Sequence, residues 1–392
     1  MKRICNRLAA ELPQLPSKYI AMLSDRGFRD RKHLEEIVRG NPDGGQLLCN
    51  ALEIDEKAML KAFGWTRWPE HIGFTLSGPC PLGGVLEPTK EMNGARRTQN
   101  VGLPSERLPT ASSLISRYGP ARNQGHVGTC TAFGTVAIVE GQCSIKVDLA
   151  EAFVYGLTKA TDGHPDADGS RLCDSAPILS QYGVCCEQTW PYREDRDYLR
   201  LRPSDEAFAE ASKFQLSDVA MALEPTDKNA VRTHIAAGHP VAISLAIYRS
   251  TMNSLRFHDE GRFLMKLGLL DTVAGYHAMC AVGYLDNAYL IEHGFSEEPG
   301  GGAFLVRNSW GPSWARNNPQ AKLFGGEAGY ALMPYAYLEN YCFEAYTAVV
   351  KSSGVGHSST FRSRFQAAGE SWWRRTRQGV VTLARERLSI TS

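Results

Sequence analysis

The stretch that decides the fold is Arg122-Asn123-Gln124-Gly125-His126-Val127-Gly128-Thr129-Cys130-Thr131-Ala132-Phe133, a glycine-rich turn that ends at a cysteine. Apolar residues then recur at helical spacing as far as Val139, which predicts a helix over residues 130–142 with Cys130 in its first turn. Unpaired N–H groups and the helix dipole favour a thiolate there, and the thiolate is the nucleophilic form of cysteine. Gln124 stands where a side-chain amide can stabilise an oxyanion. A buried, unreactive cysteine is the competing interpretation.

Two downstream segments carry the other residue types that a cysteine nucleophile needs. The segment 275–284 predicts a buried strand with His277 near its beginning, and the segment 302–311 predicts a second strand that runs into a turn at Asn308. Adjacent antiparallel strands would bring these two side chains together. An imidazole can pair with the thiol and later protonate a leaving amine, and a neutral amide can fix the tautomer of the imidazole. Taken alone, a histidine in an apolar strand is more often an ordinary core or surface residue.

Together the three segments resemble the papain-like cysteine peptidases, in which the catalytic residues follow the order Gln, Cys, His, Asn. The resemblance covers about residues 111–350 and is closer to bacterial members of the family than to secreted plant or lysosomal ones. Further matching segments are Gln181-Tyr182-Gly183-Val184, Thr189-Trp190-Pro191-Tyr192 and Gly329-Tyr330.

The resemblance also implies a role for each matching residue. Cys130 is the expected nucleophile, His277 the general acid and base, Asn308 the orienting amide and Gln124 the oxyanion donor. Trp310 is expected to shield the hydrogen bond between the histidine and the asparagine from water. The expected lining of the substrate cleft comprises Gly169, Ser170, Cys173 and Tyr276.

The chain departs from the family pattern next to the nucleophile. Val127 stands where secreted relatives usually carry a disulfide cysteine, and Thr131 replaces the usual tryptophan. The cleft loop of those relatives is replaced by a segment like Asp166-Ala167-Asp168-Gly169-Ser170-Arg171-Leu172-Cys173. Loss of the disulfide fits a reducing compartment. Cys173 is either a second reactive thiol or a packed thiol on a predicted helix.

Composition excludes several classes of protein. The chain has 392 residues, a formal net charge of +1 and 43% hydrophobic residues, which predicts two or three folded units. The near-zero charge gives no general attraction to nucleic acid, so none is expected as a partner. Ten cysteines in this length are too sparse for a disulfide scaffold, and their spacing is not that of zinc ligands. We expect no metal and no other cofactor.

The start of the chain predicts a cytoplasmic location. Its residues lack the apolar run of a signal peptide, and no stretch of about 18 apolar residues predicts a spanning helix. Export by a specialised secretion machine stays open.

The chain divides into four parts. Residues 1–75 form a helical N-terminal module with four amphipathic runs, 76–110 a Gly/Pro-rich linker, 111–350 the peptidase domain and 351–392 a basic amphipathic tail. In the peptidase domain, helical runs at 130–142, 149–159 and 172–183 precede strand-like runs at 240–245, 278–284, 303–306 and 330–333. This order predicts an α+β fold. The papain-like resemblance implies a helical lobe and a β-barrel-like lobe with the cleft between them.

The flanking parts allow several interpretations. Residues 1–110 are either an inhibitory propeptide that lies through the cleft, or an adaptor whose helical module binds a protein partner or simply packs. The tail carries seven arginines against Glu370 and Glu386 from residue 361 onward, which suits an anionic membrane surface, an acidic partner or docking on the protein itself. The segments 295–302 and 312–326 are longer than a minimal member of the family needs, and each is either a loop at the cleft rim or an insertion.

The predicted function is therefore a cysteine peptidase that hydrolyses peptide bonds of a protein or peptide substrate through a thioester acyl-enzyme. A catalytically silent binding scaffold with the same fold is one alternative. A thiol acyltransferase or transpeptidase is the other, because hydrolysis and transfer pass through the same intermediate.

Overall fold

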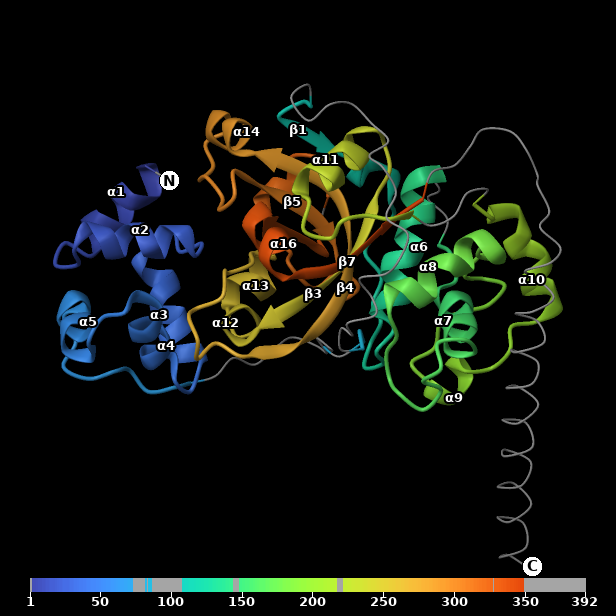
Figure 1. Cartoon of the computed structure of the whole chain (residues 1–392), viewed down its shortest axis with the longest axis horizontal. Helices are drawn as coiled ribbons and strands as arrows, with labels where there is room; N and C mark the ends of the chain where they lie inside the picture. The colour runs from blue at the N-terminus through green and yellow to red at the C-terminus, as the bar shows by residue number, and fades with distance from the viewer. Residues whose placement is uncertain are drawn as a thin grey trace, which may run out of the picture.

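The computed structural model describes residues 2–72, 82, 84–86, 108–143, 148–216, 221–326 and 328–348. The predicted basic tail and most of the predicted linker lie outside the described residues. The described chain forms an N-terminal helical module, a β lobe and a helical lobe, which follow one another across the molecule with the β lobe in the middle (Figure 1). Within these ranges, no helix has the length and hydropathy that a membrane span needs.

The N-terminal module contains α1 (Lys2–Glu11), α2 (Ser17–Asp25), α3 (Arg31–Gly40), α4 (Gly44–Leu52) and α5 (Glu56–Phe63). The four predicted amphipathic runs lie in α2 to α5. The side chain of Asp55 caps α5 by accepting a hydrogen bond from the N–H of Ala58 at 3.0 Å. The helix α1 has no counterpart among the predicted runs, although Ile4 and Leu8 stand one turn apart and are both buried.

The helical lobe is built around α6 (Cys130–Cys143), with α7 (Glu151–Lys159), α8 (Leu172–Gln181), α9 (Arg196–Leu199) and α10 (Asp205–Ala211) beside it. Every residue from 127 to 141 is buried, so α6 is covered on all sides rather than on one face. It packs against α7 and α8 and also against the sheet of the β lobe. The three helices predicted in this lobe are present, with ends that differ by no more than two residues.

The β lobe contains seven antiparallel strands: β1 (Ala111–Ser113), β2 (Met221–Ala222), β3 (Val241–Tyr248), β4 (Val273–Asp286), β5 (Gly302–Arg307), β6 (Tyr330–Pro334) and β7 (Cys342–Thr347). Their order is β2-β7-β3-β4-β5-β6, and β1 pairs with β4. The helices of this lobe are α11 (Lys228–Ala236), α12 (Arg249–Met252), α13 (Leu255–Glu260), α14 (Asn287–Glu292), α15 (Pro319–Lys322) and α16 (Tyr335–Tyr341). The predicted α+β class and all four predicted strands are confirmed, whereas β1, β2 and β7 have no predicted counterpart.

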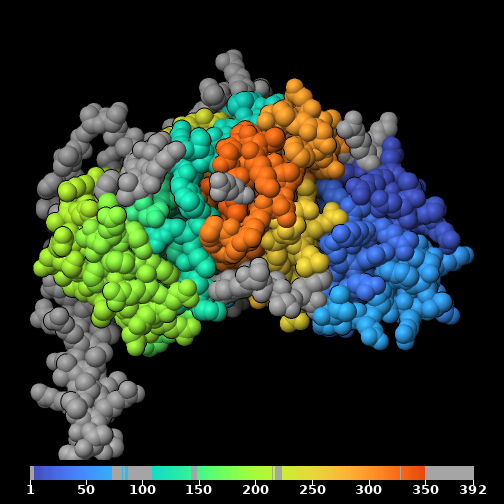
Figure 2. Space-filling view, turned by 180° about the vertical axis from the view of Figure 1, so that it is seen from behind, coloured from blue at the N-terminus to red at the C-terminus, as the bar shows by residue number. Residues whose placement is uncertain are grey.

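The N-terminal module packs on the β lobe, on the side away from the helical lobe (Figure 2). Leu264 and Leu267, from the segment between α13 and β4, belong to the same apolar cluster as the core of the module. Arg29 of the module donates to Glu298 at 2.6 Å, and Arg262 of the β lobe donates to the same carboxylate. Of the two interpretations of the segment 295–302, a loop at the cleft rim or an insertion, the structure favours the insertion, because Glu298 is buried at the contact with the module.

Removing the Glu298 carboxylate should destabilise the protein strongly. In Glu298→Ala the guanidinium of Arg29, only 6% exposed, would lose its counter-charge, and a broken buried pair costs about 3–5 kcal/mol. Chemical denaturation measures the loss. The control is Arg202→Ala, which breaks the exposed ion pair with Asp205 and should cost less than about 1 kcal/mol. Equal effects of the two substitutions would contradict the assigned role of Glu298.

Candidate active site

Cys130 occupies the first position of α6, where the helix meets the sheet. Its Sγ accepts a hydrogen bond from the backbone N–H of Ala278 in β4 at 3.4 Å, although the two residues are 148 positions apart. The preceding turn is shaped by Gly125, whose φ of +64° is costly for other residues. The structure therefore brings the predicted nucleophile directly to the strand that carries the predicted histidine.

His277 and Asn308 lie side by side, as the sequence predicts. The antiparallel pairing of β4 with β5 places Cys280 opposite Arg307, so Asn308 follows the end of β5 close to His277. His277 Nε2 lies 2.7 Å from Asn308 Oδ1, and both residues are buried. Because the amide oxygen can only accept, Nε2 carries the proton and Nδ1 is the basic nitrogen. Nδ1 is buried and has no hydrogen-bond partner among the described residues.

Trp310 covers this hydrogen bond. Its ring centroid lies 4.8 Å from that of His277 at an interplanar angle of 30°, and the tryptophan is 2% exposed. A buried indole at this distance keeps water away from the imidazole, which agrees with the expected shielding position.

Gln124 is buried, and Ser309, which is not among the predicted site residues, connects it to the turn of Asn308. The hydroxyl of Ser309 donates to Gln124 Oε1 at 2.6 Å, and the backbone N–H of Gln124 donates to the carbonyl of Ser309 at 2.9 Å. Gln124 Nε2 donates to the carbonyl of Val127 at 2.9 Å, which uses one of its two N–H groups. The amide is thus held in one orientation. The only sequence signal for Ser309 is its place directly after Asn308.

A short segment of the predicted linker lies against Cys130, the predicted nucleophile. We call residues 84–86 the strap. The N–H of Ser170 donates to the carbonyl of Gly84 at 3.1 Å, and the N–H of Leu86 donates to the carbonyl of Ser170 at 2.9 Å. A methyl carbon added to Gly84 would lie 2.6 Å from Cys130 Sγ, so this glycine lies against the sulfur.

Burial shifts the pKa values of Cys130 and His277 in opposite directions. Desolvation raises the pKa of the Cys130 thiol to about 12, although N–H groups including that of Ala278 oppose the shift. Desolvation also lowers the pKa of His277 to about 4, against the hydrogen bond with Asn308. The sequence predicts a thiolate here. In the structure the pKa of this thiol is raised rather than lowered, because Cys130 is fully buried at the tip of α6.

The four predicted cleft residues lie on different elements of the structure. Gly169 and Ser170 lie beside the strap and the nucleophile turn. Cys173 lies in the first turn of α8, where it is partly buried, and burial and then Glu344 raise the pKa of its thiol. Tyr276, next to His277, is half-buried, and its ring meets that of Phe343 edge-on at 5.6 Å.

A cluster of buried charges lies behind Asn308. A small cavity there is lined by residues of both lobes, including Arg122, Glu140, Glu151, Arg307 and Asn308. Arg122 pairs with Glu151 at 3.0 Å, and desolvation raises the pKa of both Glu140 and Glu151. Arg307 at the end of β5 lies 3.9 Å from Glu140 of α6, and this ion pair joins the helical lobe to the strand end that carries the asparagine.

Comparisons with known proteins agree with this geometry. The family model described as papain family cysteine protease matches residues 113–321. An uncharacterized peptidase C1-like protein of Acanthamoeba polyphaga mimivirus is 26% identical over 250 residues, 59% of this chain and 67% of that protein. Papain of Carica papaya is 26% identical over 200 residues, 50% of this chain and 49% of papain, so the chain spans about half of that relative's length.

A bacterial structure shares the fold. Xylellain, a cysteine protease from Xylella fastidiosa, superposes with a TM-score of 0.55 at 22% sequence identity, covering 69% of this chain and 96% of xylellain. At that identity the likeness concerns the fold alone.

The raised pKa of the Cys130 thiol can be tested in the intact protein. Because the pKa is raised, Cys130 stays protonated at neutral pH and should ionise only in strong alkali. The measurement is the ultraviolet absorbance of the thiolate in the wild type minus that in Cys130→Ser. A thiolate band at neutral pH in the intact chain would contradict the conclusion that Cys130 and His277 are both uncharged.

Proposed function

Since the chain belongs to the papain family of cysteine proteases, we propose that it hydrolyses peptide bonds of protein or peptide substrates with Cys130 as the nucleophile. The observation that carries the proposal is the arrangement of three groups. The sulfur at the tip of α6 contacts the strand of His277, and His277 is hydrogen-bonded to Asn308. A silent scaffold has no physical need for this arrangement.

The proposed reaction starts when Nδ1 of His277 takes the thiol proton. The thiolate attacks the carbonyl carbon, and the C=O electron pair moves to the oxygen. The N–H of Cys130 and the free N–H of Gln124 Nε2 donate to this oxyanion, and such donors are each worth about 10²–10³ in rate. His277 then gives its proton to the leaving amine as the C–N bond breaks, which leaves a thioester on Cys130.

Water completes the reaction. Nδ1 of His277 removes a proton from water, the hydroxide adds to the thioester, and the C–S bond breaks to release a carboxylic acid. The Cys130 sulfur recovers the proton from His277. Asn308 keeps Nε2 protonated throughout, so that Nδ1 remains the nitrogen that exchanges protons.

The strap supports a second part of the proposal, in which the linker is an inhibitory segment. Gly84 excludes any substrate carbonyl from the space next to Cys130 Sγ. Its own carbonyl oxygen accepts from the N–H of Ser170, so it is held at the cleft edge rather than by the oxyanion donors. The strap therefore occupies the cleft without presenting a bond for attack.

The strap can be tested by adding one methyl group. Gly84→Ala should clash with the sulfur and raise both peptide hydrolysis and alkylation of Cys130 by iodoacetamide roughly ten-fold or more, since a relief of about 1.4 kcal/mol suffices. Mass spectrometry of the Cys130 peptide follows the alkylation.

The matched control is Gly119→Ala. No atom lies within 4 Å of a methyl group at that position, so both rates should stay at the wild-type level. Unchanged alkylation in Gly84→Ala would contradict an inhibitory strap.

The catalytic assignment is tested in the Gly84→Ala chain. Adding Cys130→Ala should abolish hydrolysis of a casein or peptide substrate, and adding Cys173→Ala should leave it near its starting value. Labelling by an epoxysuccinyl probe should disappear with Cys130→Ala only. Hydrolysis that survives Cys130→Ala would reject the proposed function, and transfer to an added amine in place of hydrolysis would favour an acyltransferase.

A further inference from the structure

A fully buried lysine lies behind the backbone of Gly169 and Ser170, which we call the cleft edge. Lys159, the last residue of α7, donates from Nζ to Asp162 Oδ2 at 2.7 Å, to the carbonyl of His164 at 2.6 Å and to the carbonyl of Gly169 at 2.9 Å. The side chains of Lys159 and Asp162 are both 0% exposed. All three N–H groups of the ammonium are therefore used, and two of the three acceptors are backbone carbonyls of one loop.

That loop ends in the edge on which the strap pairs. Gly169, with φ of +100°, turns the chain so that its carbonyl meets Lys159, and the next residue, Ser170, pairs through its backbone with Gly84 and Leu86. The ammonium thus holds one peptide group of the edge, and the neighbouring residue pairs with the extended strap.

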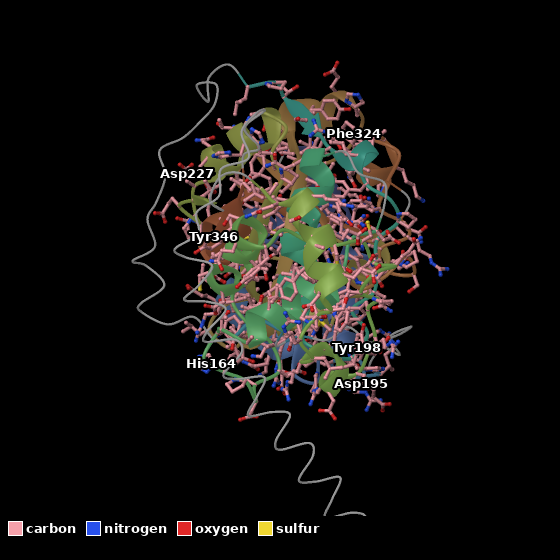
Figure 3. The ribbon with its side chains drawn as sticks, turned by 90° about the vertical axis from the view of Figure 1, so that its right-hand side faces the viewer. His164, Asp195, Tyr198, Asp227, Phe324 and Tyr346 are labelled. Atoms are coloured by element: carbon pink, nitrogen blue, oxygen red, sulfur yellow. The ribbon has the colours of Figure 1, made fainter. Side chains whose placement is uncertain are left out.

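A second side chain fastens the same loop to the nucleophile turn. Asp168 Oδ1 accepts from the N–H of Gly128 at 3.1 Å, two residues before Cys130, and its Oδ2 accepts from Arg196 at 2.6 Å. In Figure 3, His164 lies at the lower end of the helical lobe, and Asp195 and Tyr198, which flank and belong to α9, lie at the same end. The contact between this loop and α9 is the one between Asp168 and Arg196.

In the described part of the chain, no disulfide joins this loop to the nucleophile turn. The eight cysteines whose side chains the structure describes are all free, and Val127 stands at the position next to Gly128. The distance between the cleft edge and the nucleophile turn therefore depends on hydrogen bonds from charged side chains, which are stronger than those between neutral groups.

We propose that Lys159 is a positioning residue for substrate binding, which with Asp168 holds the backbone of Gly169 and Ser170 in place to pair with an extended peptide. The inference rests on the proposed function, because the peptide that it concerns is the substrate. The strap is an occupant of the same edge within the chain itself. Loss of the ammonium therefore weakens the pairing of both the strap and the substrate, and leaves the groups that perform the chemistry intact.

The test uses the full chain with Lys159→Met and Asp162→Asn together, which removes the donors without leaving a buried carboxylate unpaired. In the intact chain, alkylation of Cys130 by iodoacetamide should accelerate roughly ten-fold, since the strap binds less well. In the Gly84→Ala background, KM for a peptide should rise roughly ten-fold while kcat changes less than about two-fold.

The matched control is Asp162→Asn alone. It removes the ion pair but keeps the ammonium, which still donates to Gly169, so it should lower stability in chemical denaturation and leave KM unchanged. A purely structural role for Lys159 would give both variants the same KM. That result, with unchanged alkylation in the double variant, would overturn the proposal.

A second variant tests the proposal even if the double variant does not fold. Asp168→Ala, whose side chain is partly exposed, removes the tie to Gly128 and should also raise KM and accelerate alkylation. Wild-type values for both would overturn the proposal. Alkylation needs no turnover, so this readout stands even if the chain hydrolyses no peptide.

Discussion

The contact between the first turn of α6 and strand β4 is the constraint on which the site depends. Cys130, the proposed nucleophile, comes from the helical lobe and the imidazole of His277 from the β lobe, so the two residues lie close only while α6 lies against the sheet. Gly134 permits this approach, because a methyl group there would lie 3.3 Å from the carbonyl of Met279. A helix buried on every side cannot move without losing contacts in both lobes, which holds the site in one geometry.

Local patterns predicted the parts of the site that lie in regular elements. Cys130, His277 and Asn308 stand at the ends of apolar runs whose period is visible in the sequence, and the structure places them together as those runs require. The strap had no such signal. Gly84 lies in a Gly/Pro-rich stretch without periodicity, and its place is set by pairing with Ser170, 86 positions later in the sequence. The Arg29–Glu298 pair spans 269 positions, so no window of sequence contains it. The direction of the thiol pKa was equally hidden, because burial is a property of the assembled lobes.

Closure of the cleft acts on the site in two physical ways. The strap excludes a substrate carbonyl, and burial makes the ion pair unfavourable, since both charged forms lose their hydration. A thiolate needs an imidazolium beside it, so the two shifts work together: a raised cysteine pKa and a lowered histidine pKa leave both groups neutral. Access and protonation are therefore coupled. Because desolvation is the largest cause of the raised pKa, we expect exposure of Cys130 to solvent to lower it again.

The two attachments of the N-terminal region differ in kind. The module is joined to the β lobe by a shared apolar cluster and by buried guanidinium–carboxylate pairs, whose separation would leave charges without partners. The strap is joined to Ser170 by two backbone hydrogen bonds and by the burial of Val85. Backbone hydrogen bonds exchange readily for water and contribute only about 0.5–1.5 kcal/mol each. Among the described residues the strap therefore has the weaker attachment. The module contacts the segments around Leu264 and Glu298 rather than the edge that Lys159 holds, so release of the strap would break none of the module's contacts with the β lobe.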